Sequence, residues 1–66
     1  MQIRDFTQSE ADYLQAVCNF TDEENTLFEL RLKDFSLEDC AERMNRSIDS
    51  VKVLSRRVNA KIKREI

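Results

Sequence analysis

The side chains best suited to bind a partner are the basic ones, and most of them lie in the second part of the chain. Residues 43–66 carry eight Lys and Arg against two acids, a net charge of +6, whereas residues 1–42 carry three against eleven, a net charge of −8. A segment this basic attracts polyanions. The plainer alternative is a solvated helix with many positive charges. We expect residues 43–66 to face a polyanion and the acidic part to face away from it.

The remaining residue types do not favour catalysis or metal binding. The chain has no His, the commonest metal ligand and general base, and no Gly to build a phosphate loop. Cys18 and Cys40 lie in helical apolar patterns without metal-ligand spacing, so we expect buried, reduced thiols, with a disulfide or a reactive thiol as the alternative. The sequence therefore predicts no enzyme activity, no metal, no cofactor and no small-molecule ligand.

Length and composition favour one small helical domain, residues 1–66. Gly and Pro are both absent, which argues against tight β-hairpins and favours an all-α fold in which Asn and Asp end the helices. No run approaches the roughly 20 apolar residues that span a membrane, and no signal peptide opens the chain. We expect a cytoplasmic protein without a membrane partner.

Capping residues and apolar spacing predict four helices, at about 8–18, 22–33, 37–44 and 48–64. The residues expected to cap them are Thr7 or Ser9, Thr21, Ser36 and Ser47. Glu10 and Glu24 would complete capping boxes with Thr7 and Thr21. The short third helix, a turn at Asn45 and the long fourth helix then form a helix-turn-helix.

The outer helices differ in their apolar stripes. The first has a narrow one, Leu14, Val17 and Cys18, with Ala11 and Tyr13 at its margins. It could pack on the rest of the domain or form a dimer contact. In the last helix, Val51, Leu54, Val58 and Ile62 fall on one side at about 100° per residue, and the opposite side is basic.

Three fragments between Phe20 and Ile62, a region of about two-thirds of the chain, match the residue spacing of a known motif without any insertion. They are Phe20-Thr21-x-x-Glu24-x-x-Leu27-Phe28-x-Leu30, Ser36-x-x-Asp39-Cys40-Ala41-x-x-Met44 and Ser47-x-x-Ser50-Val51-Lys52. LuxR-type regulators and region 4 of sigma factors show L-T-x-x-E-x-x-V-L-x-L, S-x-x-E-I-A-x-x-L and S-x-x-T-V-K at the same spacings. The chain thus resembles their four-helix DNA-binding domains, and small sigma-like regulators of phages and conjugative elements are similarly short.

The turn departs from the family pattern at two positions. Asn45 replaces the usual Gly, and Asn tolerates the left-handed conformation. Arg46 replaces an apolar residue, and because a guanidinium is costly to bury, Arg46 should point outward. Further along, Leu54 stands where some members carry His or Arg, and its position on the apolar stripe indicates a core residue.

The resemblance implies that the last helix enters the DNA major groove. The positions matching the family's reading face are Ser47, Asp49, Ser50, Lys52, Val53 and Arg56. Lys52 or Arg56 could donate to guanine, and Asp49 could accept from cytosine. An exposed Val53 could meet a thymine methyl. Beside this face, Arg46, Arg57 and Lys61 are the candidates for phosphate contacts.

The resemblance thus predicts a sequence-specific DNA-binding protein that regulates transcription, with double-stranded DNA as its partner. A homodimer would be usual for so small a module. Its surface could be the first helix or the end of the last, where Ile62 and Ile66 continue the apolar stripe, although that end could equally serve the core. The alternative is a module that binds RNA polymerase or another transcription protein, which the acidic first part favours.

Overall fold

Four α-helices make up the part of the protein that the structure describes. A computed structural model describes residues 6–65, with α1 at Gln8–Val17, α2 at Asp22–Leu32, α3 at Leu37–Met44 and α4 at Ile48–Glu65. No strand occurs among these residues. The predicted all-α, four-helix fold is therefore confirmed, and every helix end lies within one residue of its predicted position.

Side-chain caps begin each helix where the sequence places them. Thr7 and Thr21 form complete capping boxes with Glu10 and Glu24: each threonine oxygen accepts from the glutamate backbone N–H at 3.2 Å, and each carboxylate accepts from the threonine N–H at 2.9 Å. Ser36 accepts from the backbone N–H of Asp39 at 3.1 Å. These bonds satisfy amide groups that a helix start would otherwise leave unpaired.

At three helix ends, Asn or Asp adopts the left-handed backbone conformation that glycine commonly adopts there. Asn19, Asp34 and Asn45 follow α1, α2 and α3 with φ angles of 53°, 68° and 56°. This left-handed region costs Asn and Asp less than other side chains, because their short polar groups can bond locally. The chain therefore reverses after each short helix without any Gly.

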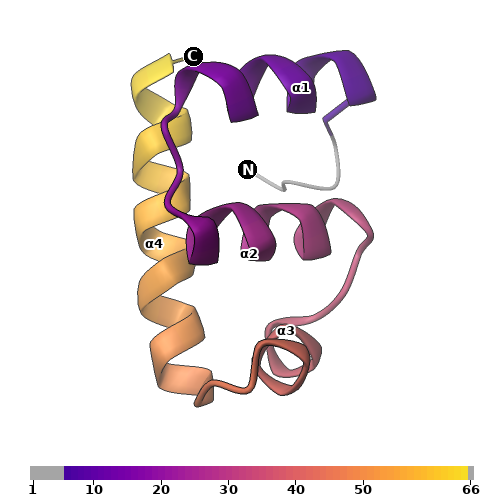
Figure 1. The fold of residues 1–66 in the computed structure, drawn as a ribbon, viewed down its shortest axis with the longest axis vertical. Helices are drawn as coiled ribbons and strands as arrows, with labels where there is room; N and C mark the ends of the chain where they lie inside the picture. Colours follow the sequence, from indigo (N-terminus) through magenta and orange to yellow (C-terminus); the bar gives the residue numbers. More distant parts are fainter. Residues whose placement is uncertain (1–5, 66) are drawn as a thin grey trace.

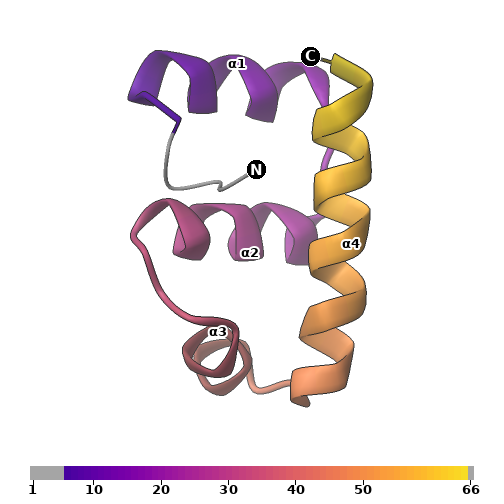
Figure 2. The ribbon, with the colours of Figure 1, turned by 180° about the vertical axis from the view of Figure 1, so that it is seen from behind.

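Helix α4 is the axis on which the other helices are arranged. It runs along the length of the molecule, with α1 and α2 lying across it and α3 beside its N-terminal end (Figure 1). The view from behind shows the same order, with α1 at the C-terminal end of α4 (Figure 2). Helices α1, α2 and α3 all contact α4, most extensively α2 and α3.

One hydrophobic core joins the four helices. Its fully buried members include Leu27 and Phe28 of α2, and Val51, Val58 and Ile62 of α4. The stripe predicted for the last helix is therefore correct, and Leu54, 8% exposed, belongs to it. Phe20, just before α2, adds an aromatic contact with Phe28, with ring centroids 5.1 Å apart.

The apolar side of α1 differs from the predicted one. Ala11 is fully buried together with Leu14 and Cys18, whereas Val17 is 38% exposed and Tyr13 57% exposed. The three buried residues define the face by which α1 packs on the rest of the protein, and Val17 lies about a quarter of a turn away from that face. At the other suggested dimer surface, Ile62 is fully buried, and Ile66 lies outside the described residues.

The two cysteines are free and buried. Burial raises the pKa of both thiols, which disfavours the reactive thiolate. The expectation of buried, reduced cysteines is confirmed. Among residues 6–65, no helix has the length and apolar character that a membrane crossing requires.

Candidate nucleic-acid interface

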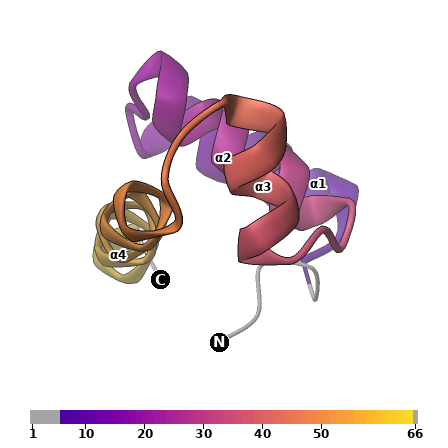
Figure 3. The same ribbon diagram turned by 90° about the horizontal axis from the view of Figure 1, so that it is seen from below.

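Helix α3, the following turn and the start of α4 form one tightly bonded unit. Asn45 adopts φ 56° and ψ 46°, and the backbone N–H of Arg46 donates to the carbonyl of Ala41 at 2.9 Å. The Ser47 hydroxyl accepts from the backbone N–H of Ser50 at 3.2 Å, at the start of α4. Seen from below, α3 lies beside α4, which is viewed end-on (Figure 3). The turn thus fixes how α4 projects from α3.

The candidate residues lie mainly on the open surface. The exposed ones are Arg46, Ser47, Asp49, Ser50, Lys52, Val53, Arg56 and Arg57. Even Val53, an apolar residue, is 43% exposed, because α4 packs on the core through its opposite side. Lys61 is the exception, since its side chain is only 24% exposed. Eight of the nine predicted residues are therefore exposed, and they lie in the turn before α4 and along the N-terminal half of α4.

Arg46 points outward, as its charge requires. Its side chain is 49% exposed, and its guanidinium forms an ion pair with Glu23 in the first turn of α2. Glu23 was not among the predicted site residues. Its acidic charge at a helix start is explained by the helix dipole alone, so no sequence signal indicates that it reaches the turn 23 residues away.

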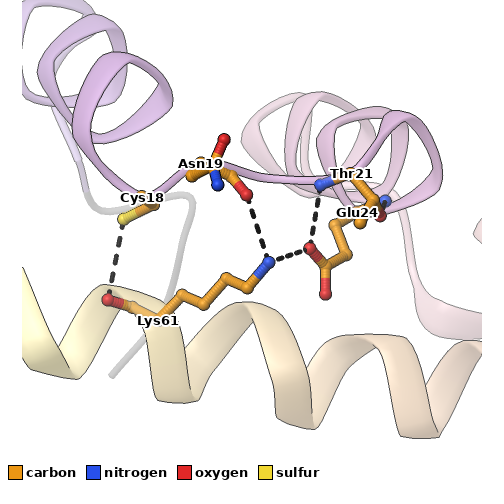
Figure 4. Close-up of polar contacts among 5 residues, drawn as sticks. All are labelled: Cys18, Asn19, Thr21, Glu24 and Lys61. Atoms are coloured by element: carbon orange, nitrogen blue, oxygen red, sulfur yellow. Dashed lines mark hydrogen bonds and ion pairs between the residues drawn. The ribbon is translucent and has the colours of Figure 1, made fainter.

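Lys61 makes contacts within the protein that the sequence does not predict. Its Nζ donates to the carbonyl of Asn19 at 3.2 Å and to the carboxylate of Glu24, 37 residues away (Figure 4). The Sγ of Cys18 lies 3.6 Å from the Lys61 carbonyl. Lys61 thus fastens the chain between α1 and α2 to α4. An ammonium already bonded twice within the protein is a poor candidate for a phosphate contact.

Glu24 is ionised in a buried position. Its side chain is 3% exposed. Burial has the largest influence on the pKa of Glu24 and raises it, but the hydrogen bonds from Lys61 and Thr21 and the Lys61 charge together hold that pKa below its ordinary value. This partly buried pair therefore holds the N-terminus of α2 against α4, and with it the orientation of the basic face.

Two further basic residues were not among the predicted site residues. Arg64 lines a surface depression of about 480 Å³ together with Arg57 and Ala60; its spacing of seven residues from Arg57 was a helical signal for the same side. Arg43 stacks over the ring of Phe35 at 4.2 Å and is exposed. This cation–π contact joins Arg43, in the last turn of α3, to Phe35 in the chain between α2 and α3.

The described residues offer little to a metal or a buried ligand. Within residues 6–65, no group of three metal-ligating side chains comes together. A depression of about 520 Å³ lies at the C-terminal end of α4, lined by Phe6, Tyr13, Leu14 and other residues, and it is open to solvent. Comparison with protein families, curated proteins and solved structures finds no match for this chain.

Proposed function

We propose that the protein binds DNA in a sequence-specific manner and regulates transcription, with α4 entering the major groove. The observation that carries this proposal is the exposed basic side of α4, presented directly after a short helix and a tight left-handed turn. A helix fits the major groove of B-DNA, and residues at its N-terminal end reach base edges in helix-turn-helix proteins. A cytoplasmic location belongs to the same proposal.

Within this interface, the side chains divide by what they can recognise. Lys52 and Arg56 carry donors suited to guanine, and Asp49 is an acceptor suited to the cytosine amino group. Val53 offers an apolar surface to a thymine methyl, and the hydroxyls of Ser47 and Ser50 can donate or accept. Sequence discrimination would come from these residues.

Phosphate contacts would come from Arg46 and Arg57, which flank the first turns of α4. Both are exposed. Arg57 lines the depressions on either side of it, one shared with Ser50 and Val53 and one shared with Arg64. Arg64 replaces Lys61 as the third candidate, because Lys61 is engaged within the protein.

The test is a fluorescence anisotropy titration of a labelled DNA duplex at two salt concentrations. We expect affinity to fall steeply with salt, since each phosphate neutralised contributes about −0.9 to the slope of log K against log salt. Selection from a random DNA pool would then identify the preferred sequence. Lys33→Ala is a matched control: it removes one exposed positive charge at the C-terminal end of α2, which points away from α4 (Figure 1).

A second candidate function is binding to RNA polymerase or another transcription protein. It is favoured by the acidic, partly apolar surface of α1, where Glu10, Asp12, Tyr13 and Val17 are exposed. The same α1 surface would be available to a homodimer on a palindromic site. No binding to any duplex at low salt, together with retention of purified RNA polymerase, would replace the first proposal with this one.

A further inference from the structure

An ion pair lies at the edge of the proposed DNA-binding face. Arg46, in the turn before α4, bonds to Glu23 in the first turn of α2. The two side chains are 49% and 47% exposed, so both partners remain accessible to solvent. The pair therefore joins the helix-turn-helix to a carboxylate that comes from outside it.

Both partners lie directly against the residues proposed to touch DNA. Glu23 and Arg46 line a surface depression of about 250 Å³ together with Ser50, Val53 and Arg57. They also line a second one, of about 190 Å³, with Asp22 and Met44. A DNA strand that lies along α4 and contacts Arg57 would pass the Glu23 carboxylate.

A DNA phosphate and the Glu23 carboxylate would seek the same guanidinium. Arginine binds either anion through the same planar set of N–H donors. An exposed ion pair is weak and is screened by salt, so a phosphate can displace the carboxylate. The displaced charge then stays beside the DNA backbone and repels it.

We propose that Glu23 is an intramolecular competitor of DNA phosphate for Arg46, and that it lowers the affinity of the protein for DNA of any sequence. This inference rests on the proposed DNA-binding function. The carboxylate occupies the Arg46 guanidinium in the free protein, and a backbone phosphate replaces it in the complex. Removing the carboxylate leaves Arg46 available from the start.

The test compares Glu23→Gln with Asp22→Asn on a labelled mixed-sequence duplex at low salt. Asp22 is an exposed acid in the same turn and forms no ion pair within the described residues, so its variant measures the general effect of removing one negative charge. We expect Glu23→Gln to tighten binding about threefold to fivefold, the upper part of the range of an exposed ion pair, and Asp22→Asn to change it less. The difference should shrink at high salt.

A double-mutant cycle with Arg46→Ala isolates the competition. If Glu23 acts through Arg46, most of the gain from Glu23→Gln disappears when Arg46 is already replaced. Both positions are exposed, so we expect each variant to keep the fold. Urea unfolding of each variant measures this.

Three results would overturn the inference. The first is a Glu23→Gln variant that binds DNA with the same affinity as the wild type. The second is an equal gain in DNA affinity from Glu23→Gln and from Asp22→Asn. The third is a gain from Glu23→Gln that is as large in the Arg46→Ala background as in the wild type. Each of these leaves the proposed DNA binding in place. Failure of the wild-type protein to bind any duplex would instead remove the proposed function and this inference together.

Discussion

Glu23 and Glu24 are neighbours in the first turn of α2, yet one lies at the surface and the other in the interior. The Glu23 side chain is 47% exposed and pairs with Arg46, whereas that of Glu24 is 3% exposed and pairs with Lys61. Successive helix residues point about 100° apart, so one faces the turn before α4 and the other faces α4 itself. Glu23 therefore connects α2 to the turn before α4, and Glu24 connects α2 to the C-terminal half of α4.

The two pairs differ in what they contribute. An exposed ion pair stabilises a fold by about 0–1 kcal/mol, while removing one partner of a buried pair costs about 3–5 kcal/mol. The Glu24–Lys61 pair therefore holds the C-terminal half of α4 in place. The Glu23–Arg46 pair is weak enough to be exchanged for an external anion.

The largest expected effect comes from Lys61→Met, which keeps an apolar stem and removes the ammonium. Glu24 would remain buried without its charged partner, so we expect the free energy of unfolding to fall by about 3 kcal/mol at neutral pH. Urea unfolding followed by helical circular dichroism measures it. Lys63→Met, at an exposed position two residues on, is the control and should change little. Similar losses in both variants would contradict the structural role of Lys61.

Glu24→Gln tests the same pair through pH. At neutral pH, we expect it to lower the free energy of unfolding by about 1.5–3 kcal/mol, the contribution of a hydrogen bond to a charged group. Because folding lowers the pKa of Glu24, its ionisation stabilises the fold above the ordinary pKa of 4.5, and this contribution is lost as the pH falls through the folded-state pKa. The gap between wild type and variant should therefore narrow in acid. A gap that is constant with pH would exclude this explanation.

In the N-terminal half of α4, substitutions on the exposed side should change DNA binding and leave the free energy of unfolding unaltered. Lys52→Ala and Arg56→Ala should each weaken binding to the selected sequence by about 1–3 kcal/mol if they touch bases, while Arg57→Ala should weaken binding to all sequences alike. Titrations of the selected and a scrambled duplex distinguish the two patterns. If Lys52→Ala and Arg56→Ala together leave affinity unchanged, α4 does not read DNA through this side.

The smallest expected effect is that of Arg46→Ala on stability. Its pair with Glu23 is half-exposed, so the free energy of unfolding should change by no more than about 1 kcal/mol. The measurement is the same urea unfolding used for Lys61→Met, which makes the two ends of α4 directly comparable. A loss as large as that of Lys61→Met would show that both pairs are structural.

The local features of this protein follow from its amino-acid sequence. Helix starts at Thr7 and Thr21 are set by hydrogen bonds between residues three apart, and the end of α3 is set by the left-handed conformation of Asn45. The apolar stripe of α4 and its exposed side follow from helical spacing. All of these depend only on neighbours along the chain, which is why the helix bounds were predictable. The exposure of Arg46 was predictable for another reason, because a guanidinium is costly to bury.

Which distant charges meet depends on how the helices pack. Lys61 lies at the edge of the basic side, and its partner Glu24 is 37 residues away; Glu23 reaches Arg46 across 23 residues. On α1, the packing of the helices buries Ala11 and leaves Val17 exposed. Such pairings depend on where two helices cross and how each is rotated about its own axis. Helical spacing fixes the side of a helix on which a residue lies, but the packing of the helices decides what that side touches.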